Sequence, residues 1–247
     1  FGRAVDGSRL LLREMRGASE ADLFRLSSLA SLEGYYMKPR MDRELMQRYG
    51  AGIIGTRAAL NEQPDGHTLF AALSSIYTIL PAQQQNLPFD LNKDLIPIGL
   101  TAFEGMVMAC SPKLGVNTLA EFIALAKKMP DKLVIGTNPA GSLPHITAKL
   151  FADVTGAAIT VAPYSTGGTA EAIRDILGGR VHAVIDGWAS LRGNIDSKDL
   201  LPLAIMSPKP SSLLPNLPVA AETIPGFISI GWQALTAPKP EPIRLAG

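Results

Sequence analysis

Cysteine and histidine, the side chains that most often bind transition metals, are scarce in this sequence of 247 residues. Cys110 is the single cysteine, which excludes an internal disulfide and leaves too few thiolates for a zinc site. The three histidines are His67, His145 and His182, and none belongs to H-E-x-x-H or another paired ligand spacing. The sequence therefore predicts neither a metal ion nor another cofactor.

Neither sign of charge is in excess, since 23 Lys and Arg face 22 Asp and Glu, a formal net charge of +1. The basic residues are scattered, so nucleic acid and anionic membranes are not expected as partners. No apolar run approaches the roughly 20 residues of a membrane-spanning helix. The chain begins at Phe1 without a basic and then apolar start, so we expect a signal sequence to be absent or already removed.

Nucleotide-binding motifs are weak or missing. Gly50–Gly55 matches G-x-G-x-x-G, but polar Arg43–Arg48 precedes it where a strand is required, and Asp65 follows too early to hold a ribose. We interpret the motif as a turn into a helix over Thr56–Glu62. No P-loop occurs, so nucleoside triphosphate chemistry is not expected. The first 48 residues are polar and predict one or two helices.

The middle of the chain contains a strand, a polar loop and a helix. The strand 132–137 leads into the loop Asn138–Ser142, and Ile146, Leu150, Phe151 and Val154 follow at helical spacing on what we predict to be one face. Gly141 permits a close approach of backbone, and Ser142 before Pro144 is typical of a helix N-cap. Such a helix start points free N–H groups at one spot, which suits a carboxylate or phosphate.

The same pattern follows at once: a strand over 159–162, a loop over 163–168 with Tyr164, Gly167 and Gly168, and a helix over 169–177 with Ile173 and Leu177 inward. Consecutive units of this kind predict a parallel sheet whose loops lie at one edge, where ligands bind. A strand over 180–185 brings Asp186 to that edge. Further strands are predicted over 67–73, 95–100, 106–109, 201–206 and 227–235, with loops at Ser74–Tyr77 and Phe103–Gly105.

The residue types at this edge leave two chemistries open. Ser142, His145 and Asp186 are the types of a nucleophile, a base and an orienting acid, but the serine lacks the G-x-S-x-G elbow of an acyl hydrolase. Glycine, hydroxyl and amide groups predominate instead, which favours holding an anion over transforming it. Binding is the leading prediction and acyl hydrolysis by Ser142 and His145 the alternative.

Several short motifs then occur in a familiar order: Pro64–Leu69, Leu87–Asp90, Gly136–Leu150 with its Gly-Ser-x-x-His, Val161–Gly168, Leu177–Val181, Leu213–Thr223 and Pro225–Phe227. Together they resemble the Bug proteins, the extracytoplasmic solute-binding receptors of tripartite tricarboxylate transporters. The resemblance covers roughly residues 50–240. It implies an α/β, two-domain periplasmic-binding-protein (Venus flytrap, type II) fold with parallel or mixed sheets flanked by helices.

The resemblance further implies a first lobe over 1–101 plus 227–247, atypical at its start and truncated at its end, and a second lobe over 102–226. It implies a monomeric periplasmic protein that is not an enzyme and that binds a small carboxylate solute (a di- or tricarboxylate, an amino acid or an aromatic acid) for membrane transporter subunits. A ligand-sensing bilobal module without transport is another alternative. The implied ligand-binding residues are Ser74, Ser75, Ile76, Asn138, Gly141, Ser142, Tyr164, Gly167, Gly168 and Asp186.

Overall fold

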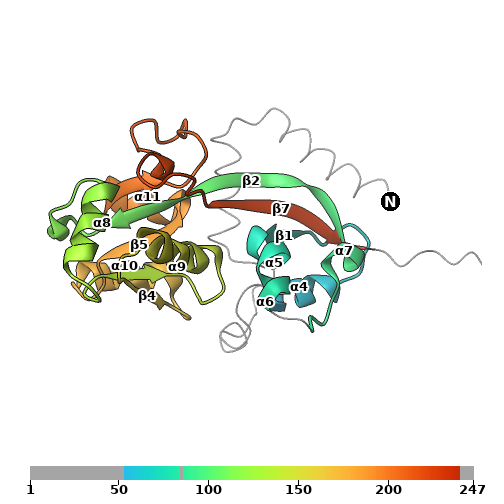
Figure 1. Ribbon diagram of the computed structural model, residues 1–247. Helices are drawn as coiled ribbons and strands as arrows, with labels where there is room; N and C mark the ends of the chain where they lie inside the picture. The colour runs from blue at the N-terminus through green and yellow to red at the C-terminus, as the bar shows by residue number, and fades with distance from the viewer. Residues whose placement is uncertain (1–52, 84–85, 240–247) are drawn as a thin grey trace, which may run out of the picture. The chain divides into compact units, whose positions relative to one another are not determined.

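The computed structural model describes residues 53–83 and 86–239, and it is a mixed α/β structure (Figure 1). The chain divides into two compact units: the first runs to Ala102 and resumes at Trp232, and the second is Phe103–Gly231. Two strands, β2 (Leu95–Cys110) and β7 (Ile230–Pro238), contribute residues to both units. The helices predicted in residues 1–48 lie outside the described residues.

The first unit pairs a short strand with β7 and surrounds it with short helices: α4 (Ile53–Leu60), α5 (Ser74–Thr78), α6 (Leu80–Gln83) and α7 (Leu91–Asp94). Strand β1 (Phe70–Leu73) runs antiparallel to β7, with Phe70 opposite Thr236. The predicted strand over 67–73 is thus shorter than expected, because the turn at Asp65 extends to His67, whose N–H donates to Asp65 Oδ1. The core of this unit is Ile53, Ala59, Phe70, Ala72, Ile76, Leu80, Leu91 and Leu95.

The second unit is a sheet covered by helices on both faces. Strand β3 (Val134–Thr137) pairs in parallel with β4 (Thr160–Pro163) and β5 (Ala183–Gly187), as the repeated pattern predicts. β2 lies antiparallel to β5 and to β6 (Leu201–Ile205). Helices α8 (Leu119–Lys128) and α9 (Leu143–Thr155) contribute to one core, and α10 (Gly168–Leu177) and α11 (Trp188–Asp196) contribute to the other.

The prediction of two strands separated by a loop at Phe103–Gly105 is wrong, because β2 is one strand of 16 residues. Gly105 permits a close contact rather than a turn: a Cβ there would lie 2.9 Å from Ser207 Cβ and from Ser207 N. Met106 and Met108 belong to the core shared with α9, while Val107 belongs to the core shared with α10. The alternation of an ordinary strand thus sorts β2 side chains between the two cores.

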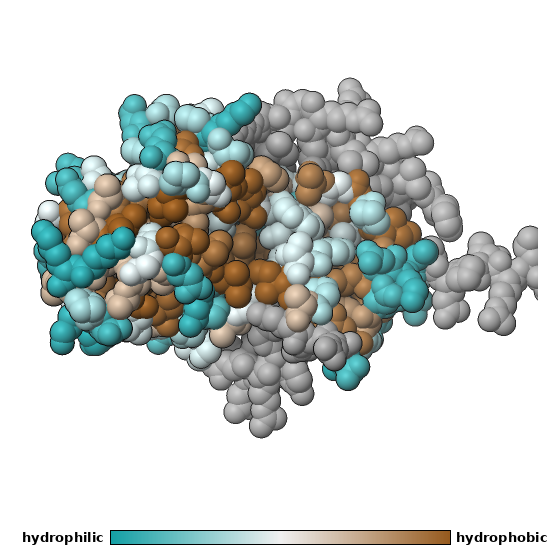
Figure 2. All heavy atoms as spheres, viewed as in Figure 1, coloured by the Kyte–Doolittle hydropathy of each residue, from teal (hydrophilic) through white to brown (hydrophobic). Residues whose placement is uncertain are grey.

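Helix α9 buries a different face from the one predicted. Phe151 is fully buried, but Ile146, Leu150 and Val154 are 39%, 45% and 50% exposed. The buried stripe lies one position away and includes Thr147, whose hydroxyl donates to Leu143 O and lies 2.6 Å from Ser229 Oγ. Because its hydroxyl has hydrogen-bond partners, Thr147 can occupy a core position. Hydrophobicity alone would place an apolar residue there. Figure 2 shows apolar surface on the second unit where α9 lies in Figure 1.

Two smaller predictions are also corrected. On α10, Ile173 is buried as predicted, but Leu177 is 46% exposed and Ile176 takes its place in the core. The strand predicted over 180–185 begins and ends later, at Ala183 and Gly187, so Asp186 lies within the strand rather than beyond it.

Candidate functional site

The first predicted loop of the second unit forms the start of α9. Ser142 is the N-cap, and its Oγ accepts a hydrogen bond from His145 N at 3.4 Å. Gly141 has φ 86, a conformation that favours glycine, and its N–H donates to His145 Nδ1 at 3.3 Å. Burial, and then the charge of Lys149, hold the pKa of His145 below its ordinary value, so the ring is neutral at neutral pH and Nδ1 can accept.

This geometry gives no support to the hydrolase alternative. The imidazole of His145 is directed to the Gly141 amide, while Ser142 Oγ meets the backbone N–H of His145 rather than its ring. A general base must lie within hydrogen-bond reach of the hydroxyl that it deprotonates. Ser142 and His145 therefore act here as a cap and a loop brace.

The second predicted loop forms the start of α10. Glu171 Oε2 accepts from Gly167 N at 3.1 Å and from Thr166 Oγ1 at 3.0 Å, which closes the loop over the first turn of the helix. Gly168 has φ 50, and a Cβ at this position would lie 2.5 Å from Asn138 Oδ1. The second loop therefore contacts the first through the side chain of Asn138, and only glycine fits at this contact.

Tyr164 faces the helix rather than the loops. Its hydroxyl donates to Asp175 Oδ2 at 2.6 Å, and Asp175 is also paired with Arg180. Burial, and then the hydrogen bond with Asp175, raise the pKa of Tyr164 to about 12, so the hydroxyl stays protonated. In this structure the hydroxyl of Tyr164 is thus used to fasten the end of β4 to α10.

A polar network, buried at Thr169 and Asp186 and half-buried at Asn138, joins both loops to the end of β5. Asn138 Oδ1 accepts from Thr169 N at 3.1 Å and lies 3.1 Å from Thr169 Oγ1, while Asn138 Nδ2 donates to Asp186 Oδ2 at 3.1 Å. Thr169 Oγ1 also lies within hydrogen-bond distance of Asp186 Oδ2, and Gly187 N donates to Asp186 Oδ1 at 2.8 Å. The structure thus brings together three of the predicted residues, Asn138, Gly168 and Asp186.

The carboxylate of Asp186 accepts several hydrogen bonds in this network. Burial raises its pKa, while hydrogen bonds from Thr169, Gly187, Ser190 and Asn138 oppose the rise by favouring the charged form. A buried carboxylate that accepts several donors retains its charge at a much lower cost than an unpartnered one. Asp186 is therefore suited to fix the positions of the two loops.

Sequence reasoning missed Glu104, which it placed in a loop between two strands. The carboxyl oxygens of Glu104 lie 2.6 and 2.8 Å from the position that a Cβ on Gly187 would occupy, directly beside Asp186. Oε2 is buried and has no hydrogen-bond partner. Burial, and then the negative charge of Asp186, raise the pKa of Glu104 to about 7. The available signal was a single charged residue inside an otherwise uncharged 16-residue stretch.

The other three predicted residues belong to the first unit. Ser74, Ser75 and Ile76 are the first residues of α5, and all three are buried. The predicted polar loop is therefore the first turn of a helix. Thr78 Oγ1 donates to Ser74 O at 2.8 Å, which satisfies one backbone acceptor of this turn.

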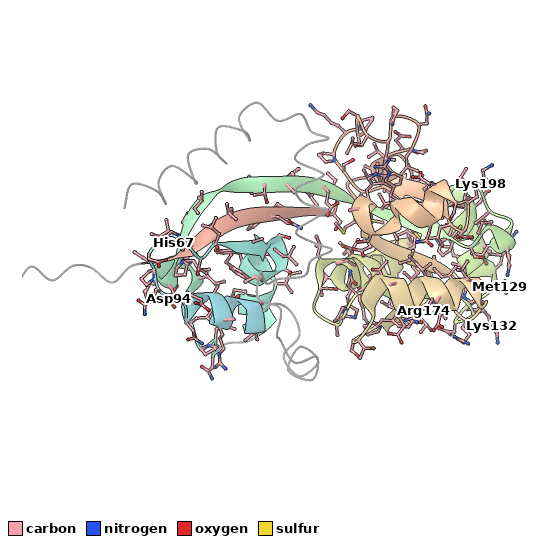
Figure 3. All side chains as sticks on the ribbon, turned by 180° about the vertical axis from the view of Figure 1, so that it is seen from behind. His67, Asp94, Met129, Lys132, Arg174 and Lys198 are labelled. Carbon is pink, nitrogen blue, oxygen red and sulfur yellow. The ribbon has the colours of Figure 1, made fainter. Side chains whose placement is uncertain are left out.

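Two features are absent from the part of the chain that the structure describes. In residues 53–83 and 86–239, no group of three or more His, Cys, Asp and Glu side chains is placed to hold a metal ion. In the same ranges no helix has the length and hydropathy to cross a membrane. Basic side chains such as Lys132 and Lys198 project from the outer surface of the second unit (Figure 3).

Several solved structures share this fold. One is R. palustris Rpa4515 with adipate, 26% identical, with a TM-score of 0.74 over 90% of this chain and 73% of that one. Another is the periplasmic binding protein BugD, 27% identical, with a TM-score of 0.69 over 78% of this chain and 64% of that one. These likenesses define the class as a two-domain solute-binding fold.

The sequence profile of the tripartite tricarboxylate transporter family receptor matches residues 46–245. The chain belongs to this family, which confirms the resemblance to the Bug proteins. Protein BugT of Bordetella pertussis is 34% identical over 198 residues, 79% of this chain. The match spans 60% of BugT, so this chain covers less than two thirds of that relative.

One further similarity is of a different kind. A stretch of 35 residues is 66% identical to the DNA polymerase III subunit alpha of Saccharopolyspora erythraea, but it spans 14% of this chain and 3% of the polymerase subunit. A match to so small a part of a large enzyme carries no statement about function.

Proposed function

We propose that this protein is a periplasmic receptor that captures a small carboxylate-bearing solute for a tripartite tricarboxylate-type transporter. The observation that carries the proposal is the polar network in which Asn138, Thr169 and Asp186 hold two glycine loops together at the starts of α9 and α10. Family membership and the adipate bound to the related Rpa4515 support a carboxylate as the ligand.

The proposed recognition uses backbone rather than cationic side chains. The N-terminus of a helix carries a partial positive charge, which stabilises a carboxylate. We assign solute contacts to Gly141, Ser142, Gly167 and Gly168, and we assign to Asn138 and Asp186 the positioning of these loops. Tyr164 supports the second loop through its strand, and the remaining proposed residues are Ser74, Ser75 and Ile76 of the first unit.

The wider role is also a proposal. We propose that the two units are the lobes predicted over 1–101 plus 227–247 and over 102–226, that the receptor is a monomer, and that its partners are the membrane subunits of the transporter. Co-purification with those subunits is expected for a receptor, whereas a sensing module without transport predicts another membrane partner.

Calorimetric titration of the full chain with mono-, di- and tricarboxylates tests the proposal. We expect saturable heat with at least one of them, adipate included in the panel, and a matching rise in melting temperature. At a solute concentration of 100 times the dissociation constant the added stability is about 2.7 kcal/mol. The diamide of adipic acid is the matched control, because it keeps the shape and loses both charges. The absence of both heat and a thermal shift with every carboxylate of the panel would overturn the proposal.

A pair of glycine variants locates the site. Gly168→Ala places a Cβ against Asn138 Oδ1, so we expect affinity for the solute to fall tenfold or more. Gly115→Ala is the matched control, because Gly115 also has a positive φ but nothing lies within 4 Å of its Cβ position. Equal losses of affinity in the two variants would argue against a site at these loops.

A further inference from the structure

We propose that Glu104 is a specificity-determining residue of this site, which in its neutral form donates a hydrogen bond to a carboxylate group of the bound solute. The inference rests on the proposed function and extends it to the protonation state of the complex. Its consequence is that the protein takes up one proton from solvent when it binds a solute carboxylate at alkaline pH.

Glu104 lies directly against the polar network of Asn138, Thr169 and Asp186. Its carboxyl group lies against Gly187, the residue whose N–H donates to Asp186, and only the missing side chain of this glycine leaves room for it. The Cγ of Glu104 lies 4.0 Å from the Cβ position of Gly231, which in turn lies 3.4 Å from Leu143 Cδ2. Leu143 directly follows Ser142, so Gly231 lies between Glu104 and the start of α9.

The hydrogen-bond supply decides which of the two carboxyl groups holds the proton. Asp186 accepts from Asn138, Thr169 and Gly187, all of which favour its charged form. Glu104 has a buried Oε2 without a partner, and a charged carboxylate in that position would lack the donors it needs. Two neighbouring carboxylates do not ionise independently, and the one with fewer donors is protonated first.

Few groups act on this proton. Among the titratable side chains of the described residues, Asp186 is the one whose charge acts on Glu104, and it favours the neutral form. The two glycines whose Cβ positions lie near Glu104, Gly187 and Gly231, carry no charge. A solute carboxylate brought to this position adds a second negative charge, which strengthens the preference for a proton. The neutral carboxyl then supplies an O–H donor that an ionised one lacks.

The test is a proton count by calorimetry. Adipate is titrated into the full chain at pH 6.5 and 8.5, each in two buffers of different ionisation enthalpy; if adipate gives no heat, the tightest-binding carboxylate of the panel is used. We expect uptake close to one proton per solute at pH 8.5 and much less at pH 6.5. The dissociation constant rises by roughly tenfold for each pH unit above the pKa of Glu104.

The variant Glu104→Gln keeps the shape and is a permanent neutral donor. We expect it to bind with no proton uptake and with an affinity that does not change between pH 6.5 and 8.5. Glu222→Gln, an exposed change in the same unit, is the matched control and should behave as the original protein does. A residue with a merely structural role would leave the proton count unchanged.

The outcomes separate the two proposals. Binding without proton uptake, or equal uptake in the Glu104→Gln variant, overturns the role of Glu104 and leaves the receptor proposal standing. Binding of glutamate but not adipate, lost in Glu104→Gln, also overturns it, because Glu104 then accepts from an ammonium group. If no carboxylate binds, the proposed function fails and this inference fails with it.

Discussion

Glu104 and Asp186 show how two carboxyl groups on neighbouring strands acquire different roles. Both are withdrawn from water, which raises the pKa of each. Hydrogen bonds from Asn138, Thr169 and Gly187 offset the cost of burying the Asp186 carboxylate. Glu104 Oε2 has no hydrogen-bond partner to offset its burial. The difference arises from backbone and side-chain placement rather than from residue type, so no sequence pattern reveals it.

The raised pKa of Glu104 predicts how stability changes with pH. With a folded-state pKa of about 7 and an ordinary value of 4.5, the folded protein binds more protons than the unfolded chain between these limits. The free energy of unfolding therefore falls as pH rises through this window, by about 3 kcal/mol from this group. Urea unfolding from pH 4.5 to 8 measures this slope.

The variant Glu104→Gln removes the titrating group and should flatten that part of the profile, whereas Glu222→Gln should not. Identical slopes for the original protein and Glu104→Gln between pH 5 and 7 would show that Glu104 is not protonated in the folded state.

At the scale of the element, the hydroxyl of Ser142 caps α9 and is also the solute contact that we propose. Ser142→Ala removes the N-cap and should cost about 1 kcal/mol of unfolding free energy, while Ser142→Gly should cost only a few tenths. Both variants lose the hydroxyl, so affinity for the solute should fall equally in both. Chemical denaturation and calorimetry measure the two effects. An affinity that follows stability instead of the hydroxyl would contradict a ligand contact by Ser142.

The buried and exposed faces of α9 give a second prediction. Phe151 packs with ring centroids 6.3 Å from Phe122 and 6.0 Å from Phe227, so Phe151→Ala should lower the unfolding free energy by about 3–5 kcal/mol. Its neighbour Leu150 is 45% exposed, and Leu150→Ala should cost less than about 1 kcal/mol. Denaturant unfolding of the two variants distinguishes them. Similar losses would mean that the predicted face, not the observed one, is buried.

The sequence was informative where local rules act. The cap at Ser142 and the parallel pairing of β3 with β4 and β5 follow from short patterns, and the structure confirms them. The sequence was misleading where contacts between distant residues determine the local structure. Gly105 was interpreted as a turn because its close approach to Ser207 involves a residue far along the chain. The same error removed Glu104 from consideration.

At the scale of the whole molecule, the second unit is continuous in sequence and the first is not. Phe103–Gly231 contains two hydrophobic cores on the two faces of its sheet, whereas the first unit needs segments from both ends of the chain. Because each compact unit with its own core can in principle fold alone, the second should do so when expressed separately.

We expect the fragment Phe103–Gly231 to unfold cooperatively in urea and to show native circular dichroism. The same fragment with Phe151→Ala is the control and should be strongly destabilised. A fragment without cooperative unfolding would show that the second unit depends on the remainder of the chain.

The single cysteine has a practical consequence. Cys110 is fully buried in β2, and burial raises the pKa of its thiol to about 12, so it forms almost no thiolate at neutral pH. Maleimide dyes react with thiolates and should therefore not label Cys110. Cysteines introduced at exposed Arg57 and Lys128, one in each unit, can therefore be labelled without a background signal. Energy transfer between the two dyes would then report, molecule by molecule, whether adding a carboxylate changes the distance between the units.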